Sequence, residues 1–342
     1  MFPDGWRHPT LRSLRFLDPA LLVAALALGA CSGTDNPVAP TGTDEPATPA
    51  DVPTATATES AAPDFVLTAA TSQRIVFTST RRGGYDIFKM DPLGSSIAPL
   101  TSSTDWEFSP AWSHNNSRIA LVRPRRDAKN VAHYDIYVIN ADGSGGHWAR
   151  STPSSYDLDN PDWSPDGSRL VVSVSISGTW YVGWITLATG QLGVYSTGFG
   201  GLPGRNPTYS PTGQIVYMGG TGMTIDRINA DGSGHKTLVS SASGVGEPAV
   251  SPDGKKIAFE KVSGGFNQDI YVKNLVTGTT TRLTTYSGPD LQPSWSPDGS
   301  KIAFMSARSG QYQIWTMSAT TGGSLTRITH TSTVEKDPAW SH

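Results

Sequence analysis

Short apolar runs recur through residues 73–342, and turn-forming residues separate them. In the unit that starts at residue 292, four runs can be read, at residues 292–295, 301–306, 313–317 and 325–329. The second run of each unit is rich in Ile, Val and Phe and shows little polar alternation, as expected for a strand that neighbouring sheets cover on both faces. The pattern predicts four β-strands in each unit and an all-β fold.

The whole unit repeats along the chain. The segment QPSWSPDGSKIAFM at residues 292–305 returns as NPDWSPDGSRLVVS at 160–173, EPAVSPDGKKIAFE at 247–260 and NPTYSPTGQIVYM at 206–218, with looser copies SPAWSHNNSRIALV at 109–122 and DPAWSH at 337–342. The aligned first-strand positions, 41 to 51 residues apart, are Trp112, Trp163, Tyr209, Val250, Trp295 and Trp340. A period of this length built from short strands predicts a six-bladed β-propeller, with these side chains packed between adjacent sheets.

The first and last units are each incomplete. Residues 74–79, 86–91 and 98–102 read as second, third and fourth strands with no first strand before them, and residues 337–342 read as a first strand alone. Pairing of these N- and C-terminal strands in one blade would leave no open sheet edge in the ring. We therefore expect residues 73–342 to form one domain of six blades.

The Asp-Gly pairs at 166–167, 253–254 and 298–299 are expected to form the turns between first and second strands, since Gly accepts the positive φ that tight hairpins require. They lack the ligand spacing of a calcium-binding loop. We therefore interpret them as turns.

Residues 1–30 have the pattern of a signal peptide. Arg7, Arg12 and Arg15 precede an apolar run at residues 19–30, which is shorter than the roughly 20 residues that a membrane-spanning helix needs. The small residues that lead to Cys31 resemble the lipobox of bacterial lipoproteins. That resemblance implies cleavage before Cys31, lipid attachment to it and a place in the bacterial cell envelope, on the outer membrane, its periplasmic side or the cell surface.

Residues 31–72 are dominated by Pro, Thr and Ala and contain few large apolar residues. Such a composition cannot bury enough surface to fold alone, and frequent prolines favour extended chain. We predict a disordered tether between the lipidated Cys31 and the propeller.

Composition narrows the function classes. The net charge of −3 gives no electrostatic case for binding DNA or RNA. Cys31 is the only cysteine, so disulfides within the chain, thiol catalysis and cysteine-based zinc sites have no candidates. The motifs G-x-S-x-G, H-E-x-x-H, C-x-x-C and the P-loop do not occur. We expect a monomer that binds no nucleic acid and is an interaction module rather than an enzyme.

The frame P-x-W-S-P-D-G-(S/K)-x-I-A-F, followed by D-I-Y, resembles the WD40-like repeat of the TolB-type propeller family over about residues 73–342. TolB itself is a soluble periplasmic protein of the Tol–Pal envelope system with a separate N-terminal α/β domain. This chain has a lipobox and a tether in place of that domain. The resemblance implies the fold and an envelope setting, and it leaves the function open because the scaffold carries unrelated roles.

One set of residues is a candidate binding site. The residue before the repeated proline is polar in all six units: Ser109, Asn160, Asn206, Glu247, Gln292 and Asp337. Proline is expected to hold its predecessor in an extended conformation, at the start of the strand nearest the central channel. Nearby acidic residues include Asp159, Asp290 and Glu335.

Two interpretations of this set remain open. The side chains can cap turns and satisfy backbone N–H groups. Alternatively, they can form a ring at one mouth of the channel, as a polar, net-acidic pocket for a peptide segment, a sugar or a cation. No cofactor is predicted, although oxygen ligands would suit a divalent cation such as calcium.

These observations favour a non-catalytic, lipid-anchored envelope protein that presents its propeller to a protein or glycan partner. The alternative is a carbohydrate-active enzyme, because oligogalacturonate lyases resemble the same repeat family. Such a lyase would need a base and metal ligands, often histidines, in the channel, and the polar ring contains no histidine. A third hypothesis is a remnant of a larger sensory or transport assembly.

Overall fold

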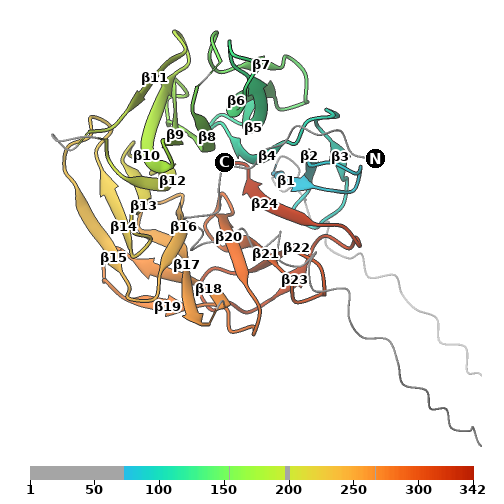
Figure 1. Ribbon diagram of the computed structural model, residues 1–342. Helices are drawn as coiled ribbons and strands as arrows, with labels where there is room; N and C mark the ends of the chain where they lie inside the picture. The colour runs from blue at the N-terminus through green and yellow to red at the C-terminus, as the bar shows by residue number, and fades with distance from the viewer. Residues whose placement is uncertain (1–72, 154, 197–200, 266) are drawn as a thin grey trace, which may run out of the picture. The chain divides into compact units, whose positions relative to one another are not determined.

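Six four-stranded antiparallel sheets, here called blades 1 to 6, follow one another around a central channel in the computed structural model (Figure 1). The structure describes residues 73–153, 155–196, 201–265 and 267–342, and these contain strands and no helix. A membrane-spanning helix is accordingly not found among them. The predicted signal peptide, the lipidated Cys31 and the tether at residues 31–72 lie outside the described residues.

Blades 2 to 6 each use four consecutive strands. Blade 2 contains β4 (Phe108–Trp112), β5 (Arg118–Arg126), β6 (Ala132–Asn140) and β7 (His147–Trp148). Blade 3 contains β8 (Asp157–Trp163), β9 (Arg169–Ile176), β10 (Thr179–Thr186) and β11 (Gln191–Val194). Blade 4 contains β12 (Gly204–Tyr209), β13 (Ile215–Gly219), β14 (Thr224–Ile228) and β15 (Lys236–Ser240). Blade 5 contains β16 (Val245–Val250), β17 (Lys256–Gly264), β18 (Asn267–Asn274) and β19 (Thr280–Arg282). Blade 6 contains β20 (Asp290–Trp295), β21 (Lys301–Ser306), β22 (Gln313–Ser318) and β23 (Thr326–Arg327).

Blade 1 joins the two ends of the propeller. Its strands are β24 (Glu335–Trp340), β1 (Ile75–Ser79), β2 (Asp86–Met90) and β3 (Ala98–Pro99), in the order β24-β1-β2-β3. The backbone N–H of Arg74 donates to Ser341 Oγ at 2.9 Å, and the N–H of Ser341 donates to the Arg74 carbonyl at 2.8 Å. The predicted closure and the count of six blades are therefore confirmed.

In blades 3, 5 and 6 a serine and an aspartate close the turn between the first and second strands. In blade 3, Ser164 Oγ donates to Asp166 Oδ1 at 2.6 Å, and the Ser168 N–H donates to the same oxygen at 3.0 Å. Gly167 follows with a φ of 69°, in the left-handed region that favours glycine. These contacts account for the S-P-D-G segment as a turn, as expected from the sequence.

The hydrophobic core lies between adjacent blades. Trp163 is fully buried and packs against Val122 and Val138 of blade 2 as well as Leu170 of its own blade. Its indole Nε1 donates to the carbonyl of Ala111 at 3.1 Å, and Trp295 repeats this bond with the carbonyl of Ala249 at 3.0 Å. The predicted inter-sheet packing of the repeated aromatic residue is confirmed. In blades 3 and 6 this bond also anchors the inner strand to the preceding blade.

Candidate functional site

Every inner strand carries a β-bulge at its X-Pro pair. In blade 2, Phe108 pairs with Val122 and Ala111 pairs with Ala120, so two residues, Ser109 and Pro110, face one residue on β5. The other five blades show the same shift in register. Proline fits this position because it has no N–H to offer the sheet, and bulges are where strands tolerate it.

The bulge places the residue before each proline in the left-handed region. The φ angles of Ser109, Asn160, Asn206, Glu247, Gln292 and Asp337 lie between 42° and 56°. The expectation of an extended conformation at these positions is therefore wrong. Proline disfavours the right-handed helical region for its predecessor, and the extra residue of the bulge is accommodated by a positive φ. Such a conformation is uncommon outside glycine, and the bulge imposes it at the same level in all six blades.

The six side chains converge on one cavity of about 420 Å³. Its wall also contains the six prolines of the bulges and the aromatic residues Trp112, Tyr209, Trp295 and Trp340. Figure 1 shows the inner strands β4, β8, β12, β16, β20 and β24 around this central space. The structure thus brings together the six ring residues named from the sequence, henceforth the polar ring.

Several polar-ring side chains also hold the backbone of the next blade. Asp337 Oδ2 accepts the N–H of Ser109 at 3.2 Å, and Gln292 Oε1 accepts the N–H of Asp337 at 2.8 Å. Gln292 Nε2 donates to Asp337 Oδ1, and Asn206 Nδ2 donates to Glu247 Oε1. Gln292 and Asp337 therefore have the backbone-capping role that was the first interpretation of the ring. Glu247 and Asn160 accept no backbone N–H within the described part of the chain.

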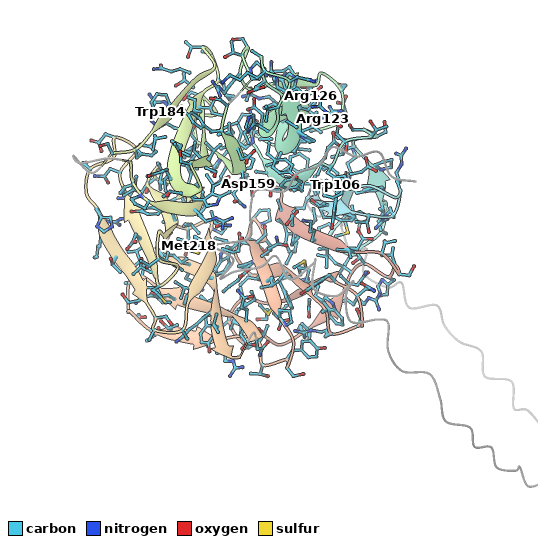
Figure 2. The ribbon with its side chains drawn as sticks, in the orientation of Figure 1. Trp106, Arg123, Arg126, Asp159, Trp184 and Met218 are labelled. Atoms are coloured by element: carbon cyan, nitrogen blue, oxygen red, sulfur yellow. The ribbon has the colours of Figure 1, made fainter. Side chains whose placement is uncertain are left out.

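A second layer of polar side chains supports the ring from the neighbouring strands. Thr78 Oγ1 donates to Asp337 Oδ2 at 2.9 Å, Ser173 Oγ accepts the N–H of Asn206 at 2.9 Å, and Glu260 Oε1 accepts the N–H of Gln292 at 2.7 Å. These residues occupy one aligned position of the second strands, where blade 4 has Met218 (Figure 2). The sequence analysis missed this layer. A polar residue inside an otherwise apolar second strand was the available signal.

Carboxyl groups crowd this end of the channel. Burial raises the pKa of Glu247 to about 7, and the charges of Asp159 and Asp337 add to the effect. Burial, with the charge of Glu247, also raises the pKa of Glu260 well above its ordinary value. Asp159 is likewise raised by burial, although its Oδ1 accepts hydrogen bonds from the Asn160 N–H at 2.7 Å and from Ser109 Oγ at 3.1 Å. A ligand with a positive charge or with hydrogen-bond donors would stabilise these carboxylates and should therefore bind favourably here.

Asp290 and Glu335 lie elsewhere. The Asp290 side chain is fully buried, and both its oxygens lie within 2.8 Å of Arg308 Nη2. The Glu335 side chain is also fully buried, with its Oε1 at 3.1 Å from Arg81 Nη2 and 2.7 Å from Thr331 Oγ1. Neither lines the cavity, so their assignment to the ring is corrected: they make buried ion pairs within blades 6 and 1. They are two residues before the ring position, and the bulge turns that side of the strand away from the channel.

Two histidines in the cavity wall escaped the sequence analysis. His114 and His342 stack with ring centroids 4.1 Å apart and planes 9° apart. Both follow a Trp-Ser pair, at the position where the other blades have the proline of their turn. Burial lowers the pKa of His342 to about 4, with a contribution from His114, so this ring is neutral at physiological pH. Their shared repeat position in adjacent blades was the missed signal.

Binding of a divalent cation such as calcium by the oxygen-rich polar ring stays a prediction. Among the described residues, no group of three or more His, Cys, Asp or Glu side chains is placed to hold a metal ion. The polar ring can still offer single carboxylates and amide oxygens to a ligand.

Known proteins share this fold. Residues 207–342 match the family described as the TolB beta propeller domain. The structure is similar to TolB from Acinetobacter baumannii (22% identity, TM-score 0.68, covering 80% of this chain and 67% of that one). It is also similar to a TolB candidate from Agrobacterium tumefaciens (17%, 0.58, 75% and 88%) and to an oligogalacturonate lyase in complex with manganese (15%, 0.51, 76% and 74%). No curated protein matches the chain in sequence. At these identities the likeness to solved structures establishes the fold.

Proposed function

We propose that this chain, which carries the TolB-type β-propeller expected from its repeats, is a non-catalytic binding module of the bacterial cell envelope. Within it, the polar ring and the cavity it lines are the binding site. The single observation that carries the proposal is the sixfold left-handed bulge, which aims six polar side chains into one cavity of about 420 Å³. A backbone conformation this unfavourable is retained where the surrounding structure and a function require it.

The ligand that suits the site is a peptide segment with a positive charge or several N–H donors. Glu247 and Asp337 line the cavity and supply acceptors, Asp159 adds its charge from behind Ser109, and the partly protonated Glu247 gains from a nearby cation. The bulge prolines and the tryptophans supply apolar wall between these acceptors. Ligand sites commonly combine such walls with a few well-placed polar groups.

The double substitution Asp159→Asn and Glu247→Gln should test the site without disturbing its shape. Both replacements keep an oxygen acceptor and remove the charge. We expect the native protein to bind the peptide (Gly-Ser-Lys)3 and not (Gly-Ser-Glu)3. The double variant should bind the first at least tenfold more weakly, because it removes the charge of Glu247 in the cavity and that of Asp159 close behind it. Isothermal titration calorimetry measures both affinities.

The matched control is Asp142→Asn with Asp231→Asn. These carboxylates make the same charge change in exposed turns, where each accepts bonds from a serine two residues on. This control should bind the lysine peptide like the native protein. Equal binding by the native protein and the channel variant would reject the site. Release of unsaturated, ultraviolet-absorbing products from polygalacturonate would reject the non-catalytic assignment and favour the lyase.

The lipid anchor at Cys31 is a separate part of the proposal, supported by the basic, apolar and small-residue pattern of residues 1–31. In bacteria fed an alkyne-labelled fatty acid, the native chain should acquire the label and fractionate with membranes. The Cys31→Ser variant should lose both properties, because the thiol that carries the lipid is gone. Labelling that survives this substitution would show that the anchor lies elsewhere or is absent.

A further inference from the structure

Exposed aromatic side chains gather on the opposite end of blades 1 and 2 from the polar ring's cavity. Trp106 is 55% exposed, Tyr156 40% and Tyr134 36%, and they lie beside the half-buried Tyr85 and Phe108. These five residues are here called the aromatic surface. Tyr85 and Tyr134 lie in or near the loops from second to third strands, whereas His114 of the cavity lies in the turn from first to second strand. In antiparallel blades these connections fall at opposite ends.

The rings are fixed in orientation by contacts with one another and with Lys336 of β24. Tyr85 and Trp106 meet edge to face with centroids 5.5 Å apart, and Phe108 and Tyr134 do the same at 5.1 Å. Lys336 Nζ lies 4.7 Å from the centre of the Tyr85 ring and 5.5 Å from that of Phe108, so it joins the two pairs. Trp106 is labelled at the inner side of this region in Figure 2. Rigid aromatic rings offer contact area with little loss of side-chain entropy on binding.

The charges around these rings are paired with one another. Arg123 Nε lies 3.4 Å from Glu107 Oε1 and 3.9 Å from Asp105 Oδ2. His133 lies between Asp127, at 3.7 Å, and Asp157, at 3.5 Å. Arg123 and His133 each lie within 4 Å of two carboxylates, so acidic groups outnumber basic ones beside these rings and the surface does not favour an anionic partner.

Hydrogen-bond acceptors nevertheless remain open to solvent at both ends of the aromatic surface. The side chain of Asp105, next to Trp106, is 53% exposed, and that of Asp157, next to Tyr156, is 44% exposed. Asp157 Oδ1 accepts the N–H of Tyr134 at 3.0 Å, which holds the carboxylate against the rings. A sugar ring presents polarised C–H groups on its faces and hydroxyl groups along its edges. Its faces complement the negative faces of the aromatic rings, and its hydroxyl groups complement the two carboxylates.

We propose that the aromatic surface binds a neutral glycan chain, with Trp106 and Tyr134 as stacking platforms and with Asp105 and Asp157 as acceptors for sugar hydroxyl groups. This site uses neither the cavity of the polar ring nor its ligand, and the two meet at Lys336, whose Nζ lies over the Tyr85 ring and 3.8 Å from Asp337 Oδ2. An apolar protein partner is the competing occupant. It would cover the rings and bury the exposed oxygens of Asp105 and Asp157 without offering them hydrogen-bond donors, which disfavours it.

The test uses the purified full chain with cellohexaose, mannohexaose and the hexamer of N-acetylglucosamine, followed by calorimetry and tryptophan fluorescence. At least one of these neutral sugars should bind with a Kd below about 1 mM. Trp106→Ala and Tyr134→Ala should each weaken that binding at least tenfold. Met223→Ala, which removes a side chain of similar exposure (38%) from the corresponding loop of blade 4, should not change it.

Absence of binding by all three sugars would overturn the glycan site, as would equal binding by the native protein and Trp106→Ala. Binding of the anionic polygalacturonate without binding of any neutral sugar would also overturn it, because it would show that the ligand's charge determines binding. Thermal melts of the variants should match that of the native chain, since both substituted side chains are exposed. The lysine-peptide assay reports on the polar ring with a different ligand, so either proposal can fail without the other.

Discussion

Deletion of residues 335–342 should prevent the chain from forming a stable propeller. These residues make up β24, the inner strand of blade 1, and their loss leaves β1 without its hydrogen-bonded neighbour on one side. Trp340, only 5% exposed in the core between blades 6 and 1, goes with them, and removing a buried tryptophan side chain alone costs about 3–5 kcal/mol. Arg81 also loses its buried partner Glu335. Together these losses rival the roughly 5–15 kcal/mol of a typical domain.

Far-ultraviolet circular dichroism and thermal melting would measure this effect. The control is a permuted chain in which residues 331–342 precede residue 73 through a Pro-Asp-Gly turn. Because Ser341 and Arg74 already exchange hydrogen bonds, this order turns blade 1 into a blade like the other five. The permuted chain should melt cooperatively near the native temperature. A truncated chain that melts within a few degrees of the native protein would refute the closure as the main support of the ring.

The substitution Glu247→Gln should raise the free energy of unfolding at pH 8 by up to about 3 kcal/mol and leave it unchanged near pH 4.5. Burial raises the pKa of Glu247 to about 7 from its ordinary 4.5, so the folded protein binds this proton more tightly than the unfolded chain. The native protein therefore loses stability as pH rises from 4.5 through 7. Glutamine has no charge to bury, and its oxygen can still accept the bond from Asn206 Nδ2.

Urea unfolding at pH 5 and pH 8 would check the sign. Asp166→Asn is the control because its hydrogen bond with Ser164 and the others in that turn lower the pKa of Asp166 to about 2. Stability from a lowered carboxyl pKa is fully present above the ordinary value and is lost only as pH falls towards 2. That variant should therefore lose the same stability at pH 5 and pH 8. A Glu247→Gln gain of equal size at both values would show that packing, and not ionisation, produces it.

The repeat pattern was sufficient to predict the architecture. The P-x-W-S-P-D-G frame marks where a strand turns back, and the alternation of strands and Gly turns sets four strands to each unit. The partial units at the two ends implied closure, and the structure confirms it in the pairing of Ile75 with Trp340. These features depend on local turn chemistry and on which residues avoid water, and both are visible in a single sequence.

The polar ring was only partly predictable. Its six members share one aligned position, so their meeting at the channel followed from the fold. The bulge could not be predicted in this way. On β24 the buried residues Glu335, Pro338 and Trp340 are spaced by three and then two positions, whereas a regular strand buries every second residue. That break in the burial pattern is the mark of an inserted residue, and it becomes visible only in the structure.

By itself, the sequence determined the number of blades, the way the ring closes and which residue of each unit faces the channel, because hydrophobic periodicity and turn residues act over short distances. Only the tertiary structure decided which acidic side chains enter the cavity. Asp290 and Glu335 face buried arginines, whereas Glu260 joins the site from a second strand. The stacking of His114 on His342 was settled in the same way. In each case the partner comes from another strand or blade, and the ionisation of a buried group depends on that partner and on its distance from water.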